Sequence, residues 1–145
     1  MSKKVASQDK APGNLLVALK EAQAKHGCLS PDFMAELSDS LDVPVNDVYG
    51  VATFYSFLAT RPKGRHIIRV CKSVPCFLNS SDTLIDSIRK ELGVEPGETT
   101  ADGRFSFELT NCIGACDKAP AMMIDNDVHG EVDRDKIAQI LKEYE

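Results

Sequence analysis

The spacing of apolar residues along the chain changes near residue 60. Before this point, apolar residues recur every three or four positions, as on one face of a helix. After it, short β-branched and alternating runs are separated by helical patterns. The sequence therefore predicts an α+β protein with two parts: a small helical bundle over residues 1–61, and a sheet covered by helices over residues 62–145.

Three short helices are predicted in the first part. The second of these helices is expected to begin with Ser30 as its N-cap and Pro31 at its first helical position. This second helix should end before Pro44, because a residue that precedes proline disfavours helical backbone angles. The third helix is expected to reach about Leu58, with its aromatic rings assigned to the core. The expected buried positions are Leu15, Leu16, Leu19 and Ala22, then Phe33, Met34, Leu37 and Leu41, then Val45, Val48, Tyr49, Ala52, Phe54 and Tyr55.

The second part is predicted to follow the order β-α-β-β-α. The segments "RHIIRVC" and "RFSFELT" read as strands, and the first ends at Cys71. A capped helix follows Ser80 or Ser81 and ends at Gly93. "AMMID" and "VHGEV" flank an expected turn at Asp125-Asn126-Asp127 and form a hairpin, and "DRDKIAQILKEY" is an amphipathic last helix. The expected buried helical positions are Leu84, Ile85, Ile88 and Leu92, then Ile137, Ile140, Leu141 and Tyr144.

Composition and charge exclude several classes of function. With 43% apolar and 27% charged residues, the 145-residue chain has the composition of a globular protein. The net charge is −5 and no basic run exceeds Lys3-Lys4, which argues against nucleic-acid binding. A helix-turn-helix over residues 38–55 is disfavoured too, since its recognition helix would lack Lys and Arg. No run approaches the roughly 20 apolar residues of a membrane helix, so we expect no membrane insertion. A secretion signal is also missing, which predicts a cytoplasmic protein.

Four of the five cysteines form two pairs. Cys71 and Cys76 make a C-x4-C motif; after 35 intervening residues, Cys112 and Cys116 make a C-x3-C motif. Cys71 ends a predicted strand and Cys76 is expected in the loop after it, while Cys112 and Cys116 are expected in a loop after another strand. Both pairs could therefore lie at one edge of a sheet. Grouped cysteines in a reducing compartment more often bind metal or do redox chemistry than form disulfides. Cys28 stands alone and is expected to be a small buried residue.

Three chemistries compete for these thiols. A zinc site usually uses C-x2-C knuckles, which both spacings exceed. A thioredoxin-type disulfide needs C-x-x-C, which the sequence lacks. A two-iron, two-sulfide cluster takes four thiolates and suits wider spacings, although the plant-type C-x4-C-x2-C pattern is not present.

The residues around the thiols favour the cluster. Gly114 and Ala115 are small enough to let backbone N–H groups approach sulfur. Val74, Phe77 and Ile113 are expected to limit the access of water. His26, His66 and His129 are separated from the cysteines in sequence, so a Rieske-type site is not indicated and structural or surface roles are expected.

Three segments carry a resemblance to a known family: "VATFYSF", "VCKSVPCFLNSSDTLI", and "NCIGACDKAPAMMID" followed by "VHGEV". From about residue 14 onward the chain resembles thioredoxin-like [2Fe–2S] ferredoxins, and in particular the 24-kDa-type small subunit of NADH dehydrogenases. The resemblance implies a helical bundle before a thioredoxin-like ferredoxin domain. It also implies that the ligands of one [2Fe–2S] cluster, with one iron per pair, are Cys71, Cys76, Cys112 and Cys116.

Two further positions are compared with that family. Asn79-Ser80-Ser81 stands where its members often have glycine, but these residues are not ligands. Pro120 occupies a place where thioredoxin-like folds often have a cis proline; the residues alone leave cis and trans open.

The resemblance implies a function in electron transfer. The chain would be a non-catalytic subunit of a multisubunit NADH-linked oxidoreductase, of the NADH dehydrogenase, bifurcating hydrogenase or formate dehydrogenase type. Its cluster would exchange electrons with the FMN of a flavoprotein partner, which also binds NAD(H), and further iron–sulfur or catalytic subunits would complete the complex. The helical bundle is expected to dock the partner. A stand-alone homodimeric ferredoxin and a zinc-stabilised adaptor are the alternatives.

Overall fold

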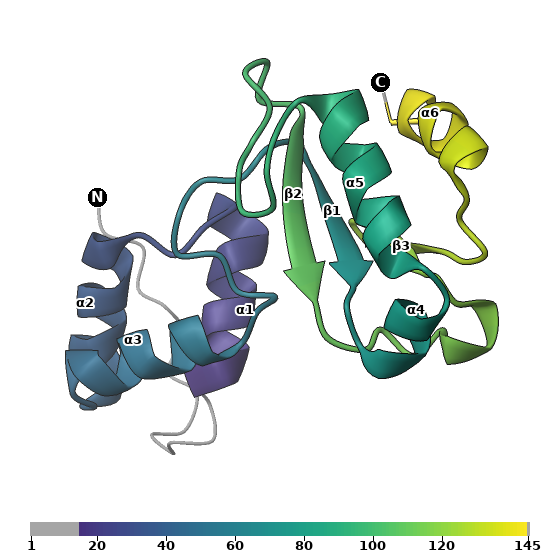
Figure 1. Cartoon of the computed structure of the whole chain (residues 1–145). Helices are drawn as coiled ribbons and strands as arrows, with labels where there is room; N and C mark the ends of the chain where they lie inside the picture. Colours follow the sequence, from purple (N-terminus) through teal and green to yellow (C-terminus); the bar gives the residue numbers. More distant parts are fainter. Residues whose placement is uncertain (1–14, 145) are drawn as a thin grey trace. The chain divides into compact units, whose positions relative to one another are not determined.

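The computed structural model describes residues 15–144 (Figure 1). The chain divides into two compact units, and the division falls between Pro62 and Lys63. Each unit has a hydrophobic core of its own, one formed between helices and the other between a sheet and two helices.

Within residues 15–62, the first unit contains helices α1 (Leu15–His26), α2 (Pro31–Leu41) and α3 (Val45–Phe54). Ser30 caps α2 as expected, because its hydroxyl accepts a hydrogen bond from the amide of Phe33 at 3.2 Å. The buried core of this unit consists of Leu15, Leu19, Ala22, Leu29, Met34, Leu37, Val48 and Ala52.

The aromatic residues near the end of α3 lie on the surface, so their assignment to the core was wrong. Phe54 is 80% exposed, and Tyr49, Tyr55 and Phe57 are also exposed. The helical period explains this: Phe54 is two positions after the buried Ala52, about 200° around the helix, and therefore points to the opposite side.

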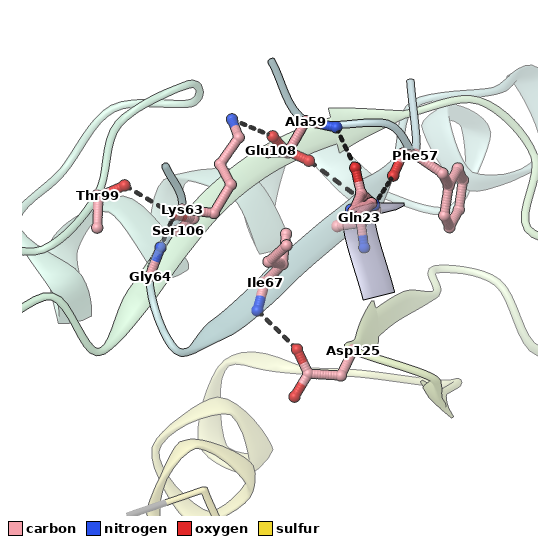
Figure 2. A network of polar contacts seen from close by, with 11 residues as sticks. Gln23, Phe57, Ala59, Lys63, Gly64, Ile67, Thr99, Ser106, Glu108 and Asp125 are labelled. Carbon is pink, nitrogen blue, oxygen red and sulfur yellow. Dashed lines mark hydrogen bonds and ion pairs between the residues drawn. The ribbon is translucent and has the colours of Figure 1, made fainter. Parts of the chain in front are cut away.

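Helix α3 ends at Phe54 rather than near Leu58, because the next segment is bound to α1. The side chain of Gln23 accepts a hydrogen bond from the Ala59 amide at 2.5 Å and donates one to the Phe57 carbonyl at 2.7 Å (Figure 2). The Leu29 amide donates to the Ala59 carbonyl at 2.8 Å. These bonds satisfy backbone groups that a longer helix would have paired internally.

The second unit is built on a sheet with the strand order β2-β1-β3-β4. Strand β1 pairs with β2 in parallel and with β3 antiparallel, and β3 pairs antiparallel with β4. Parallel neighbours end at the same edge, and Cys71 at the end of β1 pairs with Thr110 at the end of β2. The elements are β1 (His66–Cys71), α4 (Val74–Leu78), α5 (Ser81–Leu92), β2 (Phe105–Thr110), a 3-10 turn (Cys116–Lys118), β3 (Met122–Ile124), β4 (Asp127–His129) and α6 (Arg134–Lys142).

Helices α5 and α6 contact each other and share one core with the sheet (Figure 1). Ile68 and Val70 of β1 alternate with residues of the other face, as the two-residue period of a strand requires. The predicted strands and the two longer helices are confirmed. Two details differ: α4 was expected to be a loop, and Asp127 begins β4 instead of belonging to the turn.

Polar side chains on the face of the sheet opposite this core connect β1 to β2. Glu108 accepts from Lys63 Nζ at 2.5 Å and lies 3.3 Å from Arg69 Nε. The Gly64 amide donates to Ser106 Oγ at 2.7 Å (Figure 2). These contacts fix the start and the middle of the parallel pair.

A second polar cluster lies at the opposite end of β1 from Cys71. Asp125 accepts from the Ile67 amide at 2.9 Å (Figure 2). Its carboxylate also lies 2.7 Å from His66 Nδ1. The hydroxyl of Tyr144 donates to Asp127 at 3.0 Å and lies 3.1 Å from His129 Nε2. His66 and His129 therefore hold the hairpin and the C-terminal segment in place.

We expect Tyr144 to make the stability of the chain fall at high pH. Burial and the neighbouring Asp127 raise the pKa of Tyr144 to about 12, above its ordinary value of 10.0. The stabilisation is present below pH 10 and is lost as the pH rises through 12, because the phenolate forms more readily in the unfolded chain. Unfolding free energies at pH 8, 10 and 12 should show Tyr144→Phe losing about 1–2 kcal/mol less than the wild type over this interval.

Tyr49→Phe, which removes an exposed ring hydroxyl from α3, is the matched control for this titration. Parallel pH profiles for Tyr144→Phe and the wild type would contradict the expectation.

Candidate metal centre

The two cysteine pairs lie at the edge of the sheet where β1 and β2 end. Cys71 is the last residue of β1, and Cys76 follows in α4. Cys112 and Cys116 lie after β2, with Cys116 at the start of the 3-10 turn. The expectation that Cys76 lies in a loop is corrected: one short helix carries it back toward Cys71.

The first pair is buried. Cys71 and Cys76 are each 1% exposed and pack around Ala121, which is fully buried. The Cys71 amide donates to the Ala121 carbonyl at 3.2 Å. The Ala119-Pro120 bond, which precedes Ala121, is cis. Ile113, Ala115 and Ala119 complete the apolar surroundings of these two thiols.

The second pair is exposed, and its thiols are close together. The sulfurs of Cys112 and Cys116 are 3.2 Å apart. The amide of Gly114 donates to the Cys112 sulfur at 3.4 Å. Gly114 has φ +87°, a conformation that glycine adopts at low cost. The prediction that this small residue lets an N–H group reach sulfur is confirmed.

Hydrogen bonds and neighbouring charges shift the pKa values of these thiols in different directions. Burial would raise the pKa of Cys71, but donors from Ser73, Cys76 and Ile113 together lower it. The pKa of Cys76 is raised by burial and by its neighbour Cys71, against a hydrogen bond from the Ala121 backbone. The pKa of Cys116 is raised mainly by the Cys112 thiol. The charge of Cys71 also acts on Cys116, so the two pairs are close enough to interact.

Of the three apolar residues expected to limit the access of water to the thiols, only one lies against them. Ile113 packs against the buried pair, whereas Val74 is 68% and Phe77 is 57% exposed. Val74 and Phe77 thus do not exclude water from the thiols in the isolated chain. Both side chains project from α4, the helix whose Cys76 is buried.

The four thiols are of the type and number that a two-iron cluster requires. In residues 15–144, no three Cys, His, Asp or Glu side chains are placed to ligate one metal ion. A structural zinc ion takes four such ligands, whereas each iron of a [2Fe–2S] cluster takes two cysteines. The two thiol pairs, with the Gly114 N–H group directed at the Cys112 sulfur, fit that requirement.

Two residues near the thiols were not singled out from the sequence. Ser73 and Ala121 both contribute polar groups to the buried pair. The place of Ser73 between the two cysteines of the first motif was a signal, but its hydroxyl could equally have capped α4. Cys28 is half-buried between α1 and α2, in the other unit.

Among the described helices, none combines the length and the apolar character that crossing a membrane would require.

Comparison with known proteins identifies similar chains. A family model described as "Thioredoxin-like [2Fe-2S] ferredoxin" matches residues 1–145. The NADH-quinone oxidoreductase subunit designated E in Pseudomonas aeruginosa is 46% identical over 127 residues, covering 88% of this chain and 76% of the relative. The NADP-reducing hydrogenase subunit HndA of Solidesulfovibrio fructosivorans is 34% identical over 140 residues, covering 97% of this chain and 82% of the relative.

A solved structure shares the fold of this chain. The NAD+-reducing [NiFe]-hydrogenase in its air-oxidized state superimposes with a TM-score of 0.78 and 27% identity. The match covers 95% of this chain but only 24% of the hydrogenase chain, so this chain spans about a quarter of that longer protein.

Proposed function

This chain belongs to the thioredoxin-like [2Fe–2S] ferredoxin family, and we propose that it is an electron-transfer subunit of a multisubunit NADH-linked oxidoreductase. The observation that carries the proposal is the meeting of two thiol pairs at one sheet edge, one buried and one with sulfurs 3.2 Å apart. The names of the relatives support the setting, since they are subunits of NADH-quinone oxidoreductases and of an NADP-reducing hydrogenase.

In this proposal Cys71 and Cys76 hold one iron of a [2Fe–2S] cluster, and Cys112 and Cys116 hold the other. When bound, such a cluster accepts and passes one electron at a time. Ile113 and the alanines around the buried pair keep water from that side, while the N–H group of Gly114 donates to the Cys112 sulfur. A cytoplasmic location belongs to the proposal too, because reducing conditions keep these thiols free for metal.

Hydride chemistry needs a flavin or a nicotinamide, which we assign to a partner chain. The proposed partner is a flavoprotein that binds FMN and NAD(H), and this chain carries no catalytic residue of its own. The corresponding subunits of NADH-quinone oxidoreductases are 46% identical in Pseudomonas aeruginosa and 35% identical in Aquifex aeolicus, and the hydrogenase subunit is 34% identical, so both kinds of complex fall within the proposal.

Anaerobic purification of the tagged full chain from its native host tests this function. We expect a red-brown complex with two irons and two acid-labile sulfides per chain, together with an FMN-containing protein identified by mass spectrometry. A red-brown homodimer purified alone would favour a stand-alone ferredoxin. A colourless, zinc-containing protein would contradict the proposal altogether.

We also propose that the first unit docks the flavoprotein through the exposed aromatic residues around α3. Large exposed aromatic groups are typical of the centre of protein interfaces. Tyr49, Phe54, Tyr55 and Phe57 all expose more than 40% of their surface.

Phe54→Ala should weaken partner binding about tenfold, as for an interface residue that contributes more than 1 kcal/mol. The stability of the free chain should not change, because the ring is already exposed. Titration calorimetry against the purified flavoprotein measures the affinity. Val17→Ala, on the exposed side of α1, is the matched control; equal affinities for both variants would rule out a docking role for Phe54.

A further inference from the structure

The two cysteine pairs differ in what can reach their sulfurs. Cys71 and Cys76 are each 1% exposed and pack against Ile113 and neighbouring alanines. Cys112 and Cys116 are exposed. Because a thiol reacts only where a reagent can approach its sulfur, an oxidant dissolved in water reaches the second pair first.

The sulfurs of the second pair are also close to bonding distance. They lie 3.2 Å apart, whereas a disulfide joins its sulfurs at about 2.05 Å. Gly114 lies midway between the two cysteines, at φ +87°, and an added Cβ there would meet open space. The loop between the cysteines therefore has room for the approach of about 1.1 Å that a bond requires.

We propose that Cys112 and Cys116 form a reversible disulfide when the chain holds no cluster and the glutathione pool becomes oxidising. One thiolate attacks glutathione disulfide, forms a mixed disulfide and releases one glutathione; the other thiolate then attacks the mixed disulfide and releases the second glutathione. The two cysteines lose two electrons and glutathione disulfide gains them. The two thiol protons leave with the released glutathiones.

This modification goes beyond the proposed function, because it needs only the two thiols. Its consequence for the cluster does rest on that function. Metal binding requires free thiolates, so a disulfide in the second pair leaves iron without two of its four proposed ligands. Exposed disulfides are the labile kind, so a return to reducing conditions restores the site.

Tryptic peptides distinguish the possible disulfides by mass. One peptide, residues 105–118, contains both Cys112 and Cys116. Cleavage after Lys72 places the two cysteines of the first pair in separate peptides. A disulfide within the second pair therefore lowers the mass of one peptide by two hydrogen atoms, whereas any disulfide of the first pair joins two peptides.

The cluster-free full chain is reduced, incubated anaerobically with glutathione disulfide, alkylated under denaturing conditions and digested. We expect the lighter 105–118 peptide to form at least about tenfold faster than any joined peptides, because only the second pair is accessible. Three of the five thiols should then remain for alkylation, and dithiothreitol should restore all five. In urea both pairs should oxidise at similar rates, since their loops have nearly equal lengths.

Two matched variants each remove one thiol of one pair. Cys76→Ser should still form the lighter 105–118 peptide, and Cys112→Ser should not. Cys28→Ser changes a thiol of the first unit and should behave as the wild type. Circular dichroism of each variant checks that it is folded.

These measurements follow thiols and not the cluster, so they separate the inference from the proposed function. Two alkylated cysteines in peptide 105–118, or a lasting glutathione adduct on either of them, would overturn the disulfide. The same ratio of products in the native and the urea-unfolded chain would also overturn it, because the folded geometry would then have no part. If the disulfide forms but the reduced chain never binds iron and sulfide, the inference stands and the proposed function fails.

Discussion

Cys71→Ser is expected to reduce the iron and acid-labile sulfide content of the purified chain by more than about tenfold. Changes to groups behind metal ligands already cost about 10- to 100-fold in affinity, and Cys71 is itself a proposed ligand. It is also only 1% exposed, so water cannot take its place easily. Visible absorption, iron analysis and sulfide analysis measure the loss.

Cys28→Ser is the matched control for this experiment. Cys28 is a half-buried thiol of the first unit, outside both pairs, so its variant should keep the full cluster. A Cys71→Ser chain with two irons and an unchanged spectrum would remove Cys71 from the ligand set.

Gly64→Ala is expected to destabilise the second unit by about 2–3 kcal/mol. A Cβ atom at this position would lie 2.8 Å from the carbonyl carbon of Phe105 and 3.0 Å from the Ser106 amide nitrogen. Both are backbone atoms of β2, which cannot retreat without breaking its parallel pairing with β1. The hydrogen bond from the Gly64 amide to Ser106 Oγ would also be strained (Figure 2).

Urea unfolding of the full chain measures this cost. The variant should also hold less cluster, because the pairing of β1 with β2 places Cys71 beside the segment that carries the second pair. Gly50→Ala is a control whose expected effect on the free energy of unfolding has the opposite sign. Gly50 lies inside α3 with no atom within 4 Å of an added Cβ, so alanine should stabilise by about 0.5–1 kcal/mol. An unchanged unfolding midpoint for Gly64→Ala would contradict the expected clash.

Local patterns in the sequence were sufficient to predict most of the secondary structure. The cap of α2 at Ser30 and the end of α5 at Gly93 depend on the residues next to them, so the sequence contains their cause. The strands β1 and β2 follow from alternation and from β-branched residues. The four grouped cysteines were visible from spacing alone, and the structure places them at one edge because parallel strands end together.

Other features required the tertiary structure. The side on which Phe54 lies depends on where α3 meets its neighbours, and the end of α3 depends on Gln23, which is more than 30 residues away in the chain. The exposure of Val74 and Phe77 likewise depends on what surrounds α4. An apolar side chain can pack at any buried apolar position. Which positions are buried is decided by the packing of elements that lie far apart in the sequence.

The sequence by itself determined the helices, the strands and the chemical type of the site, because caps, periods and thiol spacings act over a few residues. Only the tertiary structure decided that Cys71 and Cys76 are buried while Cys112 and Cys116 are exposed. The burial of the first pair depends on contacts with Ile113 and Ala121, which lie 37 to 50 residues away from Cys71 and Cys76 in the chain.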